Sequence, residues 1–262
     1  MSWLGRLAGG LREERAREER AQGLVLDRPG ATIYAVGDVH GCHGLYRAME
    51  AAILRDPERA PDSAPVMILL GDMIDRGPES ARLIEELAAP APAGLERFCL
   101  AGNHEAMALE FLASPDPAAP WLGFGGRETL FSYGIASGAL RSRRLAGQVA
   151  AAIPAEHSGF LRGLPHYIRA GGHYFSHAGP DPALGPDAQG TRQLLWSASF
   201  LGPDLPAPPW LGAGLAVQGH VVVEEVERRG WRLCTDTGAY ATGRLSAVRL
   251  APGAEPSVLT VG

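Results

Sequence analysis

Short apolar runs and amphipathic segments alternate along the first half of the chain. Residues 33–36, 66–70 and 98–101 are continuous apolar runs of strand length, which is typical of strands buried on both faces. A few glycine-rich polar residues follow each run, and apolar positions at helical spacing come next, such as Leu45, Met49 and Ile53. Repeated strand and helix units predict a largely parallel sheet over residues 31–112.

The second half of the chain has a different pattern, with alternating apolar residues and frequent turns. This pattern favours a second sheet of mainly antiparallel strands. Two sheets packed together would give an α/β fold with four layers, α/β/β/α, built from two mixed sheets and flanking helices. We expect the later strands at residues 166–169 and 174–176, joined around Gly171-Gly172, and at 215–218, 221–226, 231–235 and 245–250.

Three segments fall outside these sheets. Residues 113–165 begin with several prolines and continue with apolar helical segments, which predicts a helical insert. Residues 1–30 contain the charged run REERAREER, so we expect an N-terminal charged helical extension that lies on the domain or docks a partner or membrane surface. A main domain at 31–250 would be followed by a tail, 251–262, that frays.

Each of the three apolar runs ends in a short cassette of glycine, acidic and histidine residues. The cassettes are GDVHG at 37–41, GDMIDRG at 71–77 and GNHE at 102–105. Open α/β sheets bind ligands at the carboxyl ends of their strands, so these side chains should share one rim. Carboxylate, imidazole and amide groups without thiolate suit divalent metals such as Mn²⁺, Fe or Zn²⁺. Two such metals, about 3.5–4 Å apart, can clamp the oxygens of a phosphoryl displacement.

Composition narrows the class of protein without changing this prediction. The 262 residues carry a formal net charge of −5, which argues against nucleic acid or an anionic membrane as the main partner. The three cysteines have no CxxC spacing, which favours a reducing compartment. No apolar run approaches the ~18 residues of a membrane span, and the N-terminus lacks a signal-peptide pattern. We therefore expect a cytoplasmic protein.

The three cassettes, in this order, resemble the signature of the phosphoprotein phosphatase family of calcineurin-like metallophosphoesterases, in its bacterial serine/threonine phosphatase branch. The resemblance continues to His177 in SHAG, to Gln218-Gly219-His220 and to DTGA, which begins at Asp236. It implies a metallophosphoesterase catalytic domain over residues 31–250 with the four-layer sandwich described above. Residues 113–165 would then cover the site.

The resemblance also implies a role for each residue of the site. Two divalent metal ions, with Mn²⁺ as the expected species, would hold a bridging hydroxide that attacks phosphorus directly. His104 would be the general acid, Asp75 would orient it, and Arg76 would bind two phosphate oxygens. Further substrate contacts are implied for Asn103, Arg127 and Tyr240. The implied ligands are Asp38, His40 and Asp72 for the first metal, and Asp72, Asn103, His177 and His220 for the second.

Two positions depart from the family pattern. Ala198 stands two residues after Trp196, where bacterial members often have an arginine that contacts phosphate. Arg127, Arg192 or Arg244 could take its place. Val221 follows His220, where the family usually has Thr-Pro or a polar residue.

Three functions are compatible with these residues. The first is hydrolysis of phosphoserine or phosphothreonine on proteins. The second is hydrolysis of a small nucleotide such as symmetrical diadenosine tetraphosphate, and the third is an inactive scaffold that binds phosphorylated partners. Enzymes of the second kind share the GDVHGC of residues 37–42, but they often replace the aspartate that stands here as Asp75. Asp75 therefore favours the first function.

Overall fold

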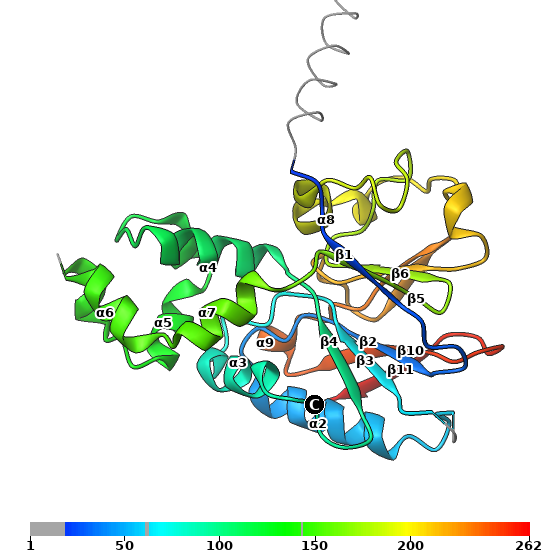
Figure 1. Cartoon of the computed structure of the whole chain (residues 1–262), viewed down its shortest axis with the longest axis horizontal. Coiled ribbons are helices and arrows are strands. Elements are labelled where there is room, and N and C mark those ends of the chain that lie inside the picture. The colour runs from blue at the N-terminus through cyan, green and yellow to red at the C-terminus, as the bar shows by residue number, and fades with distance from the viewer. Residues whose placement is uncertain (1–18, 61–62, 143) are drawn as a thin grey trace, which may run out of the picture.

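The structure is a computed structural model that describes residues 19–60, 63–142 and 144–262. These residues form two mixed β-sheets packed face to face, with helices on both outer surfaces (Figure 1). Figure 1 shows α2 (His43–Arg55) below the first sheet and α8 (Thr191–Trp196) above the second. The predicted α/β class with two mixed sheets and flanking helices is confirmed.

The first sheet contains the strands that precede the three cassettes. Its order is β11-β10-β2-β3-β4, and the central pairs β2–β3 and β3–β4 are parallel, as the sequence predicted. β10 pairs antiparallel with β2 and with β11. The helix α3 lies with α2 on the outer face. The bounds are β2 (Ile33–Val36), β3 (Val66–Leu69), α3 (Ser80–Ala88), β4 (Glu96–Cys99), β10 (Leu245–Leu250) and β11 (Ser257–Val261).

Alternate side chains of the buried strands enter different cores, although all of them are apolar. In β2, Tyr34 and Val36 pack with α2 and α3, whereas Ile33 and Ala35 pack between the two sheets. The same division separates Met67 and Leu69 from Val66 and Ile68 in β3. The continuous apolar runs thus have a physical cause, because both faces of these strands are covered.

The second sheet has the order β1-β5-β6-β7-β9-β8. The expected hairpin around Gly171-Gly172 joins β5 and β6. The expected mainly antiparallel pairing is wrong, because β1–β5, β6–β7 and β7–β9 are parallel. The long connection between β6 and β7, which includes α8, provides the crossover that parallel neighbours require. The bounds are β1 (Gly23–Leu26), β5 (Tyr167–Ala170), β6 (His173–Ser176), β7 (Ala216–Gln218), β8 (Glu227–Arg229) and β9 (Arg232–Cys234).

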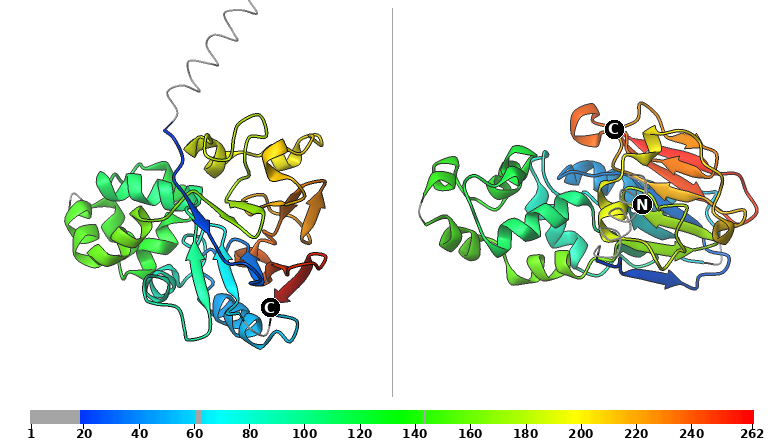
Figure 2. Two further views of the ribbon diagram at one scale, coloured as in Figure 1. Left: turned by 45° about the vertical axis from the view of Figure 1, so that its right-hand side comes forward. Right: turned by 90° about the horizontal axis from the view of Figure 1, so that it is seen from above.

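The remaining helices are divided between a lobe and the loops of the second sheet. Figure 2 shows the lobe lying beside the sheets. Its elements are α4 (Asn103–Ala113), η1 (Pro120–Gly123), α5 (Gly126–Ser132), η2 (Ser137–Arg141), α6 (Leu145–Ala152) and α7 (Ala155–Arg162). The loops contain η3 (Ser199–Leu201), η4 (Pro209–Leu211) and α9 (Ala239–Thr242).

Three local expectations are wrong. Residues 221–226 do not form a strand, because His220 has a left-handed backbone (φ 67°) that redirects the chain immediately before them. The C-terminal tail does not fray, since Ser257–Val261 pair with β10. Gly23–Leu26 of the expected helical extension form β1 instead. The charged helix itself falls mainly on residues 1–18, which lie outside the described residues.

Among the residues that the structure describes, no helix is long and apolar enough to cross a membrane.

Truncation of Ile68 tests the core between the sheets. Ile68 is fully buried in β3, so Ile68→Ala should lower the free energy of unfolding by about 2–5 kcal/mol. Val258→Ala on edge strand β11, where Val258 is 52% exposed, should cost less than about 1 kcal/mol. Urea unfolding followed by circular dichroism would measure both. Equal losses would contradict this packing.

Candidate metal centre and active site

The loops that follow β2, β3 and β4 bring the three cassettes together at one edge of the first sheet. They are linked by backbone hydrogen bonds, from His40 N–H to Asp72 O and from Gly41 N–H to Met73 O. A Cβ added at Gly102 would overlap the carboxylate of Asp72, which explains the glycine at this position. The parallel strands thus place residues far apart in the sequence within one buried cluster.

Strained backbone is concentrated at this cluster. Among the described residues, the non-glycine residues with positive φ are His40, Asp72, Asp75, Arg76 and His220, at 46° to 74°. All five belong to the predicted site. Such conformations cost on the order of 1–3 kcal/mol each and persist only where the surroundings enforce them. The backbone itself therefore marks this region as functional.

A buried glutamate enforces the shape of the second cassette. Glu105 accepts hydrogen bonds from the backbone N–H groups of Asp72, Met73, Ile74 and Gly102, at 2.8–3.3 Å. Its side chain is fully buried. Because hydrogen bonds to a carboxylate are stronger than those to a neutral acceptor, one side chain can hold two loops in register.

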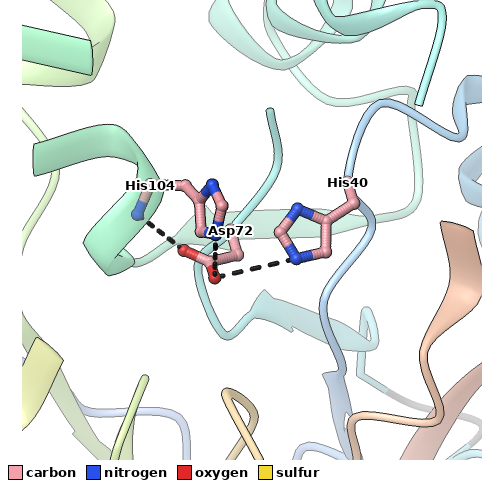
Figure 3. A group of neighbouring side chains, drawn as sticks. All are labelled: His40, Asp72 and His104. Carbon is pink, nitrogen blue, oxygen red and sulfur yellow. Dashed lines mark hydrogen bonds and ion pairs between the residues drawn. The ribbon is translucent and has the colours of Figure 1, made fainter. Parts of the chain in front are cut away.

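Asp72 lies between the imidazoles of His40 and His104 (Figure 3). Its Oδ2 is 3.8 Å from Nε2 of each ring, and its Oδ1 accepts a hydrogen bond from the backbone N–H of His104 at 3.0 Å. The Nδ1 of His40 donates to the carbonyl oxygen of Ile74 at 2.8 Å. In the neutral imidazole this bond leaves the lone pair of Nε2 facing Asp72.

A second group of ligand atoms converges on the other side of Asp72. The Nε2 of His177 lies 3.3 Å from Asp72 Oδ2, 2.9 Å from Asn103 Oδ1 and 3.1 Å from His220 Nδ1. The Nδ1 of His177 donates to the carbonyl oxygen of Leu70 at 2.9 Å, which again directs Nε2 into the cluster. Asp72 is thus shared by both groups.

The protonation of His40, His220 and Asp72 suits metal binding. Burial lowers the pKa of His40 to about 3 and that of His220 to about 4, so both imidazoles are neutral at pH 7. Burial acts to raise the pKa of Asp72, but His177, His104 and His40 outweigh it and hold this pKa well below its usual range.

The donor set itself fits divalent cations. In the second group, a proton on Nε2 of His177 can bond only some of the acceptor atoms of Asp72, Asn103 and His220. A cation between the four residues can bind one atom of each. Two groups with one shared carboxylate could therefore hold a pair of first-row metal ions.

His104 is held by residues from the helical lobe. Its Nδ1 donates to Asp75 Oδ2 at 2.7 Å, and Trp121 Nε1 donates to the same oxygen at 2.6 Å. Thr129 Oγ1 donates to Asp75 Oδ1 at 2.6 Å. Burial acts to lower the pKa of His104, but the hydrogen bond to Asp75 and nearby carboxylates raise it overall. His104 is thus oriented with Nε2 toward the metal cluster.

Arg76 lies next to Nε2 of His104, and Tyr240 lies next to Arg76 and His40. The Nη2 of Arg76 is 3.2 Å from His104 Nε2. The guanidinium carbon of Arg76 lies 4.5 Å from the centre of the Tyr240 ring, which also meets His40 edge to face. The backbone N–H of Arg76 donates to the carbonyl oxygen of Gly125. The planar guanidinium group of Arg76 is thereby held beside the cluster.

Two predicted site residues have different surroundings. Asp38 lies beside the cluster, but its carboxylate accepts the backbone N–H of His220 at 3.1–3.2 Å and is hydrogen-bonded to Asp236. Burial, together with Asp236 and Asp72, raises its pKa. Arg127 is exposed on α5, and no hydrogen bond or ion pair of the described residues links it to the cluster.

Sequence reasoning missed the residues that support the site. Glu105 stands in the GNHE cassette, but no role was assigned to it. Trp121 and Thr129 contact Asp75 across 46 and 54 residues. Nothing in their local sequence indicates these contacts, which depend on how the lobe folds back onto the loops.

Glu105→Gln tests the support of the second cassette. A carboxamide presents an NH₂ group where Glu105 has an accepting oxygen, so some buried N–H groups would lose their partner. We expect a loss of unfolding free energy on the order of 3 kcal/mol. Glu110→Gln, on the exposed side of the same helix, should change stability by less than about 0.5 kcal/mol. Urea unfolding compares the two, and matching stabilities would contradict the role of Glu105.

Comparison with known proteins places this site in a family. The model of the calcineurin-like phosphoesterase family matches residues 31–200. Serine/threonine-protein phosphatase 2 of Salmonella typhimurium strain LT2 is 27% identical over 226 residues, which cover 83% of this chain and 92% of that protein.

Solved structures share the fold at lower identity. A protein proposed to be a diadenosine tetraphosphatase has a TM-score of 0.61 at 20% identity, over 92% of this chain and 98% of that chain. A cold-active protein-tyrosine phosphatase of a Shewanella species has a TM-score of 0.52 at 16% identity, over 94% and 84%. These two likenesses show the fold alone. With the family match over most of its length, the chain belongs to the calcineurin-like phosphoesterase family and is a metal-dependent hydrolase.

Proposed function

We propose that this protein hydrolyses phosphoserine and phosphothreonine on proteins. The observation that carries this proposal is the buried pair of His104 and Asp75, whose Nδ1–Oδ2 distance is 2.7 Å. A serine or threonine alkoxide is a poor leaving group and needs a proton as the bond to phosphorus breaks. A phosphoric anhydride releases a phosphate, which leaves readily without a dedicated acid. The similarity to the Salmonella protein phosphatase also supports this choice.

Both proposed metal sites share Asp72, but the first differs from the group seen in the structure, because Asp38 takes the place of His104, which is reserved for the general acid. We propose that Asp38, His40 and Asp72 bind one divalent ion, and that Asp72, Asn103, His177 and His220 bind the other. Mn²⁺ is the expected species, with Fe or Zn²⁺ as alternatives. When bound, such a pair supplies an activated hydroxide near neutral pH and neutralises charge on the phosphoryl group.

The other residues bind the phosphate and deliver the proton. His104 donates from Nε2 to the leaving oxygen, while Asp75 holds Nδ1–H and stabilises the imidazolium. Arg76 offers its guanidinium group to two phosphate oxygens, and the ring of Tyr240 packs against this guanidinium. Arg244, one candidate to replace the arginine missing at Ala198, donates from Nη2 to the carbonyl oxygen of Glu224.

Hydrolysis of a dinucleotide such as diadenosine tetraphosphate is the second candidate. The fold shared with the proposed diadenosine tetraphosphatase favours it. The same metal ligands would act on a phosphoric anhydride, but His104 and Asp75 would then contribute little to the rate.

Asp72→Asn should lose activity and bind metal more weakly, because the shared ligand loses its charge.

A substrate panel tests the proposal. In this panel, protein reconstituted with Mn²⁺ should hydrolyse phosphoserine and phosphothreonine peptides faster than phosphotyrosine peptides or diadenosine tetraphosphate, and a chelator should abolish all activity. Preference for the dinucleotide would support the second candidate. Silence on every substrate, with metal verified by elemental analysis, would favour a binding scaffold.

His104→Asn tests the general acid separately. Phosphoserine hydrolysis should fall by about 10²–10⁴-fold, since the alkoxide leaves unprotonated. Hydrolysis of p-nitrophenyl phosphate should fall much less, because its leaving group needs no proton. The ratio of kcat values on the two substrates is the measurement, with metal content as the control. Equal losses would contradict the assignment.

A further inference from the structure

A cavity of about 540 Å³ lies between the helical lobe and the end of α8. It is lined by one side of α4, by the connection that leads through η1 and by Trp196 at the end of α8. Phe111 and Trp121 form part of its buried wall. The cavity is distinct from the metal cluster, since its lining includes none of the proposed metal ligands.

Two elements connect the lining of the cavity to the site. Asn103, Met107 and Glu110 have helical spacing on α4, so one helix face leads from the metal centre to the cavity. Trp121 lines the cavity with its indole ring and donates its N–H to Asp75. Phe124 lies at the wall, one residue before Gly125, which contacts the backbone of Arg76.

The walls combine aromatic faces with negative charge. Phe124 is 56% exposed and Trp196 is 45% exposed, although both are large apolar side chains. Glu110 and Asp116 add two carboxylates to the lining. In the part of the chain that the structure describes, no arginine or histidine forms an ion pair with either carboxylate.

We propose that this cavity binds an arginine side chain of the phosphoprotein substrate. This subsite rests on the proposed protein phosphatase function and specifies its substrate. A guanidinium is planar and cationic, so it stacks on aromatic rings and pairs with carboxylates at the same time. A nucleobase would stack but gain no charge pairing, and a nucleotide phosphate would be repelled by Glu110 and Asp116.

The spacing sets where this arginine lies in the substrate. Glu110 is seven residues along α4 from Asn103, which corresponds to about 10 Å. An extended peptide advances about 3.3–3.6 Å per residue. The arginine is therefore about three residues from the phosphorylated one.

The test is a set of phosphoserine peptides that differ at one position. Arginine, alanine or glutamate is placed two or three residues before or after the phosphoserine. We expect kcat/KM for the best arginine peptide to exceed that of its alanine match by about tenfold, from one ion pair and one cation–π contact. The glutamate peptide should be the poorest substrate.

Variants of the lining connect this preference to the cavity. The double variant Glu110→Gln, Asp116→Asn should bring the arginine-to-alanine ratio close to one, and Trp196→Ala should lower it. Glu156→Gln, an exposed glutamate on α7, is the matched control and should retain the full ratio. Thermal unfolding of each variant verifies folding.

The outcomes separate the subsite from the function. Cleavage of all peptides at one rate, or a preference that survives the double variant, overturns the subsite and leaves the phosphatase function in place. If no phosphopeptide is cleaved while diadenosine tetraphosphate is, the proposed function fails and the subsite fails with it.

Discussion

The site depends on the hydrogen bonds that the carboxylate of Glu105 accepts from the backbone. These bonds, from four backbone N–H groups, hold the GDMIDRG loop against the start of α4. Asp72, shared by both groups of ligand atoms, lies on that loop, and Asn103 and His104 begin that helix. Without this carboxylate, buried backbone N–H groups would lose their acceptor and the loop that holds Asp72 would be destabilised.

The helical lobe contributes to contacts at the site as well as to the shape of the protein. Trp121 donates a hydrogen bond to Oδ2 of Asp75, and Thr129 donates one to Oδ1. The remaining acceptor position on Oδ2 is taken by Nδ1–H of His104. The lobe thereby fixes the tautomer and the direction of the imidazole. The lobe in this way sets the surroundings of the imidazole that we propose as the general acid.

The sequence was most informative where one physical rule dominates. Fully buried runs such as Val66–Leu69 predicted parallel strands. Because ligands bind at the carboxyl ends of such strands, the sequence also predicted that Asp72, Asn103 and His104 share one edge of the sheet. It was least informative where the backbone departs from regular structure. The valines after His220 have the composition of a strand, but the left-handed His220 and the hydrogen bond from Val223 N–H to Asp236 O make them a loop. The partners of Asp75 depended on tertiary contacts that no local pattern encodes.

The left-handed residues also limit how this protein can be changed. Five such residues, at about 1–3 kcal/mol each, represent a cost comparable to the whole free energy that keeps a typical domain folded, about 5–15 kcal/mol. Glycine would relieve that strain at each position but would remove a side chain of the proposed active site. Stabilising substitutions must therefore be sought in the cores and loops away from the cluster. Within the cluster, a substitution that relieves backbone strain also changes the site.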